Sequence, residues 1–346
     1  MFKSISEGYE MLWKSIIRPD REGYSNDDLG PAEFAIDDRI YTRTDFSIIS
    51  IKGCRILCSH FEPAEDERVA EILPCVIYLH GNCSCRLEGL TAVPILLPAN
   101  TTVVAFDWSG CGNSEGTYIS LGYFERYDLE KLVEYLREKR RVGCIGLWGR
   151  SMGAVTAIYH ASQNMQIASM VLDSPYSNLR ELALELSRKY TSTPSFILKW
   201  FYNRVKQTVK EKAEFDMDSL NPIERAETCY QPALFVTGKD DDFVPSHHTQ
   251  AVYDAYKGDK DILYIEGDHN SARPQYFLEK VAQFFYTTLL CAQLPLPNFK
   301  NLPEFIERRT FGPGGCPKEV LGDDDAMLEW GIQESLKEMN KAKPNC

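Results

Sequence analysis

The feature that most constrains this chain is a short apolar segment, residues 142–148, which runs directly into Gly149-Arg150-Ser151-Met152-Gly153. An apolar segment of this length is typical of a strand that is buried on both faces of a sheet. The Gly-x-Ser-x-Gly pattern is typical of a nucleophile elbow, a strained strand-to-helix turn that exposes the serine hydroxyl. Gly149 and Gly153 are needed there because a Cβ at either position would strike a neighbouring strand or helix. Residues 154–161 then continue with helix-forming residues and an apolar face.

Strands and helices alternate along most of the chain, which predicts a mostly parallel sheet. Residues 45–52 and 55–61 are rich in strand-forming residues and meet at Lys52-Gly53, so we expect an antiparallel hairpin. Six further strands are expected at 73–79, 102–106, 142–148, 167–172, 233–237 and 262–265. Helices are expected at 85–97, 123–140, 154–161 and 274–289.

Two segments lie outside this alternation. Residues 1–20 have the apolar spacing of a short amphipathic helix that Pro19 would end, and we expect it to dock on the body rather than to lie on a membrane. The body itself is expected to span residues 21–293. Within it, residues 177–232 form a helical insertion with amphipathic helices at 179–190 and 196–212, which predicts a lid over the site. The aromatic residues of the second helix fit either an apolar acyl group beneath the lid or packing against the body.

A serine in such a turn becomes a nucleophile only when a histidine takes its proton and a carboxylate holds that histidine in one tautomer. His269 stands in a loop after a strand and before the last helix, where the base of such a site belongs. Three aspartates follow the strand at 233–237, and the order Gly238-x-x-Asp241-x-x-Val244-Pro245 favours Asp241 over Asp242 and Asp240. Asp173, after the preceding strand, is the remaining candidate for the acid.

The tetrahedral intermediate of acyl transfer needs two backbone N–H donors for its oxyanion. One comes from the residue after the nucleophile, Met152, and the other from the loop after an earlier strand, at Asn82. Gly81 would let the backbone approach the substrate closely. We expect His80 to brace this loop by hydrogen bonds and Asp107 to belong to a structural turn.

Composition excludes several classes of function. Fifty acidic against 38 basic residues give a net charge of −12, which disfavours binding to nucleic acid. The cysteines number 11, an odd count, and several lie in apolar segments, so buried free thiols are favoured over disulfides. His247-His248 has no acidic or thiol companion at ligand spacing, so we expect neither a metal nor another cofactor. The N-terminal residues resemble no signal peptide and no transmembrane segment occurs, which predicts a cytoplasmic protein.

Several motifs together resemble the α/β-hydrolase superfamily, in its serine aminopeptidase-like branch. They are Tyr78-Leu-His-Gly-Asn82, Leu147-Trp-Gly-Arg-Ser-Met-Gly-Ala-Val-Thr156, Val171-Leu-Asp-Ser-Pro175, Asp240-Asp-Asp-Phe243 and Gly267-Asp-His-Asn-Ser271. More narrowly, the chain resembles uncharacterised plant and protist α/β-hydrolases over about residues 17–290. The resemblance implies the α/β-hydrolase fold, with a twisted, mostly parallel sheet of eight strands, helices on both faces and a helical lid.

The same resemblance implies a serine hydrolase with the triad Ser151, Asp241 and His269. Members of the superfamily cleave esters, thioesters and peptides, so the likeness leaves the bond open among ester, thioester and amide. The aminopeptidase label is an analogy at the level of the fold.

Residues 294–346 differ in character, because proline and glycine become frequent and predict a flexible tail. Within it, residues 323–340 have the pattern of a short acidic amphipathic helix and resemble a ubiquitin-interacting motif, with Leu328, Gly331 and Ser335 at the characteristic positions. Glycine replaces the usual alanine, so the resemblance implies only weak binding to ubiquitin. A charged helix without a partner fits equally well. A second functional hypothesis is therefore an interaction protein with a non-catalytic hydrolase-like scaffold, but an intact triad favours the hydrolase.

Overall fold

The computed structural model describes residues 2–190 and 194–294. Apart from Leu294, the C-terminal tail lies outside the described residues, and so does the helix expected at 323–340. Ubiquitin binding by the tail stays a prediction.

Strands and helices alternate from the fourth strand onward. The strands are β1 (Glu33–Ile36), β2 (Arg39–Ile49), β3 (Arg55–Pro63), β4 (Leu73–Leu79), β5 (Thr102–Phe106), β6 (Val142–Arg150), β7 (Ile167–Asp173), β8 (Ala233–Gly238) and β9 (Lys260–Ile265). The α-helices are α1 (Phe2–Ile17), α2 (Val93–Leu96), α3 (Glu125–Lys139), α4 (Met152–Ala161), α5 (Leu179–Tyr190), α6 (Ser195–Ala213), α7 (Pro222–Ala226), α8 (Ser246–Ala255) and α9 (Gln275–Thr288).

The described strands form one sheet in the order β1-β2-β3-β5-β4-β6-β7-β8-β9. Strands β4 to β9 pair in parallel, whereas β1, β2 and β3 pair antiparallel at the opposite edge. The mostly parallel sheet is therefore confirmed, but the prediction of eight strands was wrong, because the structure has nine strands in this sheet. The additional strand is β1, which has only four residues and is too short to produce a periodic sequence pattern.

Both faces of the parallel part are buried. Along β4, Cys75, Ile77 and Leu79 belong to one hydrophobic cluster, and the alternate residues Val76 and Tyr78 belong to another. The first cluster includes side chains of α3, α4 and α8, whereas the second includes side chains of α2 and α9. Helices therefore cover both faces, and the near-continuous apolar character of β4 follows from burial on both sides.

The hairpin expected across Lys52-Gly53 is confirmed, since β2 and β3 pair antiparallel with Ile49 opposite Arg55. The single helix expected at 85–97 was wrong in detail. This segment is a 3-10 helix (Arg86–Thr91), the short α2 and a second 3-10 helix (Leu97–Ala99). Pro94 and Pro98 explain the interruption, because each lacks the N–H that a continuous helix needs.

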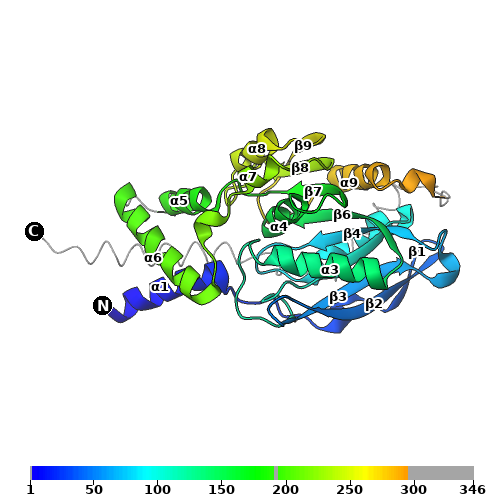
Figure 1. The fold of residues 1–346 in the computed structure, drawn as a ribbon, viewed down its shortest axis with the longest axis horizontal. Helices are drawn as coiled ribbons and strands as arrows, with labels where there is room; N and C mark the ends of the chain where they lie inside the picture. Colours follow the sequence, from blue (N-terminus) through cyan, green and yellow to red (C-terminus); the bar gives the residue numbers. More distant parts are fainter. Residues whose placement is uncertain (1, 191–193, 295–346) are drawn as a thin grey trace, which may run out of the picture.

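Helices α1, α5 and α6 lie together beyond one end of the sheet, at the left of Figure 1. The hydroxyl of Tyr9 on α1 donates a hydrogen bond to the carbonyl of Arg204 on α6 at 2.9 Å and lies 2.6 Å from the hydroxyl of Thr208. The ring of Tyr9 also meets Phe201 edge-on, with 5.8 Å between ring centroids. The N-terminal helix thus packs on the lid segment of residues 177–232.

Residues 2–190 and 194–294 contain no helix that is both long enough and apolar enough to cross a bilayer.

One buried carboxyl group in the helical layer makes stability depend on pH. Asp128 on α3 is 4% exposed and accepts a hydrogen bond from the N–H of Ser109 at 3.2 Å. Burial raises its pKa to about 7, the bond from Ser109 opposes the rise, and the nearby Glu125 adds to it. In the unfolded chain an aspartate ionises near pH 4. Between about pH 4 and 7 the folded chain therefore holds a proton that the unfolded chain has released, and the free energy of unfolding falls as pH rises.

We predict that Asp128→Asn improves stability relative to the unchanged chain more at pH 8 than at pH 5, because the amide cannot ionise. Urea unfolding at the two pH values measures the difference. Asp38→Asn, at an exposed aspartate, is the control and should show no such pH dependence. An equal effect of Asp128→Asn at both pH values would contradict the prediction.

Candidate active site

Ser151 occupies the turn between β6 and α4 with a strained backbone conformation, φ 51° and ψ −115°. Its N–H donates to the carbonyl of Asp173 at the end of β7, at 2.7 Å. A Cβ on Gly149 would lie 2.4 Å from the carbonyl oxygen of Gly153, and a Cβ on Gly153 would lie 1.9 Å from the carbonyl oxygen of Leu79. Neither distance is physically accessible, so both glycines are required for this turn.

His269 bridges Ser151 and Asp241. Its Nε2 lies 3.1 Å from the Ser151 hydroxyl, and its Nδ1 lies 2.7 Å from Oδ2 of Asp241. The other carboxylate oxygen of Asp241 accepts the backbone N–H groups of Val244 at 2.7 Å and Phe243 at 3.2 Å. With the carboxylate as acceptor, Nδ1 carries the proton and Nε2 is free to accept one from the serine. The side chains proposed from the sequence as nucleophile, base and acid thus form one hydrogen-bonded chain.

The other candidate acids have different partners. Asp242 is exposed and forms an ion pair with Lys189 on α5, and the side chain of Asp240 is exposed as well. Asp173 is buried and holds Arg273 in a two-point ion pair, with N–O distances of 2.7 and 2.9 Å. Burial, the largest single effect, would raise the pKa of Asp173, but Arg273, Arg150 and the Ser174 hydroxyl together hold this pKa below its usual value.

The loop after β4 carries His80, Gly81 and Asn82 to the side of Ser151. A Cβ built on Gly81 would lie 3.9 Å from Cβ of Ser151 and would meet nothing closer than 3.8 Å. The fold itself therefore does not require glycine at this position, which leaves room for another molecule. Among the described residues, neither the backbone N–H of Asn82 nor its buried side-chain Oδ1 has a hydrogen-bond partner.

His80 braces this loop, as its sequence position suggested. Its Nδ1 lies 2.7 Å from the carbonyl of Gly81, and its Nε2 accepts the N–H of Trp108 at 3.2 Å. The ring is fully buried, and burial lowers its pKa. Asp107 accepts hydrogen bonds from the N–H groups of Arg86 at 2.7 Å and Asn113 at 3.0 Å, and these bonds stabilise a structural turn.

A buried network that sequence reasoning missed connects the two loops of the site. Glu88 accepts the N–H of Gly81 at 3.1 Å and lies 3.5 Å from the guanidinium of Arg150. Arg150 in turn donates to the carbonyl oxygen of His269 at 2.6 Å, and Arg273 donates to the same oxygen at 3.3 Å. Arg150 fills a position that the Gly-x-Ser-x-Gly pattern leaves variable, so no sequence signal identified it.

A pocket opens at Ser151 and extends beneath the helices at the left of Figure 1. Its cavity volume is about 110 Å³. Its walls are Leu12, Ser15 and Ile16 of α1, Leu179, Leu182, Ala183, Leu186 and Ser187 of α5, Leu198, Phe201, Tyr202 and Val205 of α6, and Asn82, Leu121, Ser151, Met152, Tyr176, Met217, Phe243 and Val244. None of these side chains carries a charge.

Several solved structures are similar to this chain in fold. The chain is similar to the esterase Pf2001 of Pyrococcus furiosus, with a TM-score of 0.57, 23% identity, and coverage of 72% of this chain and 92% of that one. It is also similar to acetyl xylan esterase 1 of Thermoanaerobacterium, with a TM-score of 0.56, 18% identity, and coverage of 83% and 94%. The chain has the α/β-hydrolase fold.

Sequence comparisons agree with this fold and add relatives. Residues 71–226 match the family described as serine aminopeptidase, S33, and residues 156–310 match the family of PhoPQ-activated pathogenicity-related proteins. The uncharacterized protein YqkD of Bacillus subtilis is 29% identical over 66% of this chain and 73% of its own length. The lysophosphatidylserine lipase ABHD12 of Danio rerio is 28% identical over 52% of this chain and 47% of its own length. The narrower resemblance to plant and protist α/β-hydrolases stays a prediction.

Gly153 and Gly81 give a matched test of the described packing, because a Cβ would clash at the first position and fit at the second. We predict that Gly153→Ala costs more than about 4 kcal/mol of stability or prevents folding, because its Cβ would overlap the Leu79 carbonyl. Gly81→Ala should cost less than about 1 kcal/mol, because its Cβ would meet only ordinary contacts. Urea unfolding of both variants measures the difference, and comparable stabilities would contradict the described packing.

Proposed function

We propose that this chain is a serine hydrolase that cleaves an ester through an acyl-enzyme intermediate on Ser151. The observation that carries the proposal is the hydrogen-bonded chain Ser151–His269–Asp241, which opens on an apolar pocket without charged walls. The fold comparisons support a hydrolase, and the roles of the individual residues are our assignment.

In the proposed reaction the Ser151 oxygen attacks the substrate carbonyl while His269 takes the hydroxyl proton on Nε2. Asp241 keeps Nδ1 protonated and stabilises the imidazolium that results. When the tetrahedral intermediate collapses, the carbon–oxygen bond to the leaving alcohol breaks and the alcohol takes the proton from His269. A water molecule then attacks the acyl group by the same route, releasing the carboxylic acid and restoring Ser151.

Two backbone N–H groups would hold the oxyanion of this intermediate, those of Met152 and Asn82. Both residues line the pocket beside Ser151. The N–H of Met152 is at the first position of α4, where the positive end of the helix dipole favours negative charge. The Asn82 N–H belongs to the loop that Glu88 holds through Gly81. Removing one such donor typically costs about 10²–10³ in turnover.

The pocket walls favour a neutral, apolar acyl group. An aminopeptidase has to bind a charged N-terminal ammonium, and such a group is costly to bury without a paired carboxylate. No carboxylate lines the described pocket, so its chemistry favours an ester over a peptide N-terminus. The names of similar proteins, an esterase and a lysophosphatidylserine lipase, point in the same direction.

Loss of the nucleophile tests the proposal directly. Ser151→Ala should lower kcat/KM for p-nitrophenyl esters by at least about 10³-fold and abolish labelling by a fluorophosphonate probe, because it removes the hydroxyl that lies 3.1 Å from His269 Nε2. Ser162→Ala, at the end of the same helix, is the matched control and should retain both. Labelling that persists in Ser151→Ala would refute the proposal. A parallel series of ester, thioester and aminoacyl anilide substrates identifies the bond.

The neighbouring aspartates give a second test. Asp241→Asn should lower turnover by about 10³ to 10⁴-fold, because an amide favours the wrong imidazole tautomer. Asp242→Asn should leave turnover within about threefold, since this side chain contacts Lys189 at the surface and a surface ion pair contributes little. If the losses were reversed, the acid would be Asp242. Circular dichroism of both variants checks that the fold is retained.

A further inference from the structure

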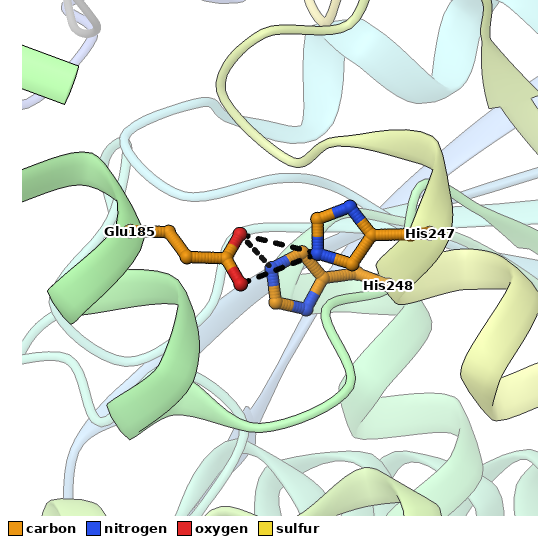
Figure 2. Close-up of side chains that lie close together, drawn as sticks. All are labelled: Glu185, His247 and His248. Carbon is orange, nitrogen blue, oxygen red and sulfur yellow. Dashed lines mark hydrogen bonds and ion pairs between the residues drawn. The ribbon is translucent and has the colours of Figure 1, made fainter. Parts of the chain in front are cut away.

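Three side chains of types that can bind a metal ion lie outside the hydrogen-bonded chain Ser151–His269–Asp241. They stand between the helical insertion and the body. Figure 2 shows Glu185 of α5 facing His247 and His248, which are consecutive residues of α8. Nε2 of His247 lies 3.1 Å from Oε2 of Glu185, and Nε2 of His248 lies 3.3 Å from the same oxygen. The expectation that this histidine pair has no acidic companion was therefore wrong. Its companion lies more than 60 residues earlier in the chain, where local spacing cannot reveal it.

These distances fit a small cation. Ligand atoms bound at about 2.0–2.1 Å to a tetrahedral zinc ion lie about 3.3–3.4 Å from one another. The distances from Oε2 of Glu185 to Nε2 of His247 and Nε2 of His248, 3.1 and 3.3 Å, are close to this length. One donor atom from each of the three residues can be chosen so that all lie within 4.8 Å of one another. The His247 side chain is 61% exposed, so its ring is free to close the remaining edge without moving packed residues.

The buried histidine is oriented as a metal ligand usually is. The side chain of His248 is 1% exposed, and its Nδ1 lies 2.6 Å from the hydroxyl of Ser177. Metal-bound histidines almost always donate the N–H of their second nitrogen to such a partner, which fixes the ring and its tautomer. The backbone N–H of Ser177 is also directed at Nδ1, but at the longer distance of 3.4 Å. When the closer Ser177 hydroxyl accepts the N–H of Nδ1, Nε2 of His248 is left to the metal.

We propose that Glu185, His247 and His248 form a site for a divalent transition-metal ion of the zinc type, with water completing the coordination. Two imidazoles and one carboxylate suit zinc and its neighbours, whereas magnesium and calcium prefer oxygen ligands alone. Without an ion, the exposed His247 makes only a surface contact with Glu185, which contributes little to stability.

The ion would join the pocket wall to the segment that carries the proposed catalytic acid. On α5, Leu182 and Leu186 line the pocket within one turn of Glu185. On the other side, α8 begins at Ser246, a few residues after Asp241. Lys189 and Asp242 already form an ion pair between the same two segments. Metal binding would therefore fix the lid helix α5 against the body, and this consequence does not depend on the proposed hydrolase activity.

The test is a titration of the full chain with Zn²⁺ alone, followed by calorimetry, with thermal unfolding recorded with and without the ion. We expect one site, and a rise in Tm when it fills, because the ion binds the folded state only. Glu185→Gln and His247→Ala should each weaken Zn²⁺ binding at least about 10-fold, and Ser177→Ala should weaken it about 10–100-fold through the lost second-nitrogen partner. Glu211→Gln, an exposed carboxylate on α6, is the matched control and should bind as the unchanged chain does.

Binding of the metal ion by cysteine thiolates, instead of by the three proposed ligands, has a separate readout. Co²⁺ in place of Zn²⁺ should give the visible absorption of a four- or five-coordinate site with nitrogen and oxygen ligands, without the near-ultraviolet charge-transfer band of a thiolate complex. Since Glu185 and His247 are not fully buried, both variants should fold, and circular dichroism without metal checks this. Unchanged Zn²⁺ affinity in Glu185→Gln and His247→Ala, a thiolate spectrum, or no binding at all would each overturn the proposal.

Discussion

The site depends on a close contact between two backbones, where the start of α4 passes the end of β4. The Gly153 Cα lies so near the Leu79 carbonyl that no side chain fits between them. This contact places the loop at residues 80–82 next to the turn at Ser151. The N–H groups assigned to the oxyanion and the hydroxyl assigned to attack are thus set by backbone packing rather than by flexible side chains. A site held in this way requires little reorganisation during reaction, which is the condition for strong electrostatic stabilisation.

Besides Asp241, four buried charged side chains hold the loops of the site in position. Arg150 and Arg273 both donate to the carbonyl oxygen of His269, and Glu88 holds the N–H of Gly81. Each charge has a buried partner of opposite sign, Glu88 for Arg150 and Asp173 for Arg273. Loss of one member of such a pair leaves an uncompensated buried charge and typically costs about 3–5 kcal/mol. The network therefore fixes the positions of these loops.

Local patterns predicted those parts of the molecule that local sequence determines. The hairpin across Lys52-Gly53 and the parallel strands followed from turn residues and apolar segments. The approach of Ser151, Asp241 and His269 followed from the order of strand ends in this fold. The sequence could not reveal β1, which is too short to be periodic, or the role of Arg150, which occupies a variable position of its motif. Nor could it reveal Glu185 beside His247, because that contact joins α5 and α8, which lie far apart in the sequence.

The hydrogen-bonded side chains and the pocket walls come from different parts of the fold. Ser151, His269 and Asp241, the proposed nucleophile, base and acid, follow the carboxyl ends of β6, β9 and β8. Much of the apolar wall comes from α1, α5 and α6, which lie beyond the end of the sheet (Figure 1). Helix α1 contacts α6 through Tyr9 and Phe201, and α5 contacts the body through Lys189 and Glu185. A shift of α5 would therefore reshape the apolar pocket while leaving the hydrogen-bonded chain in place.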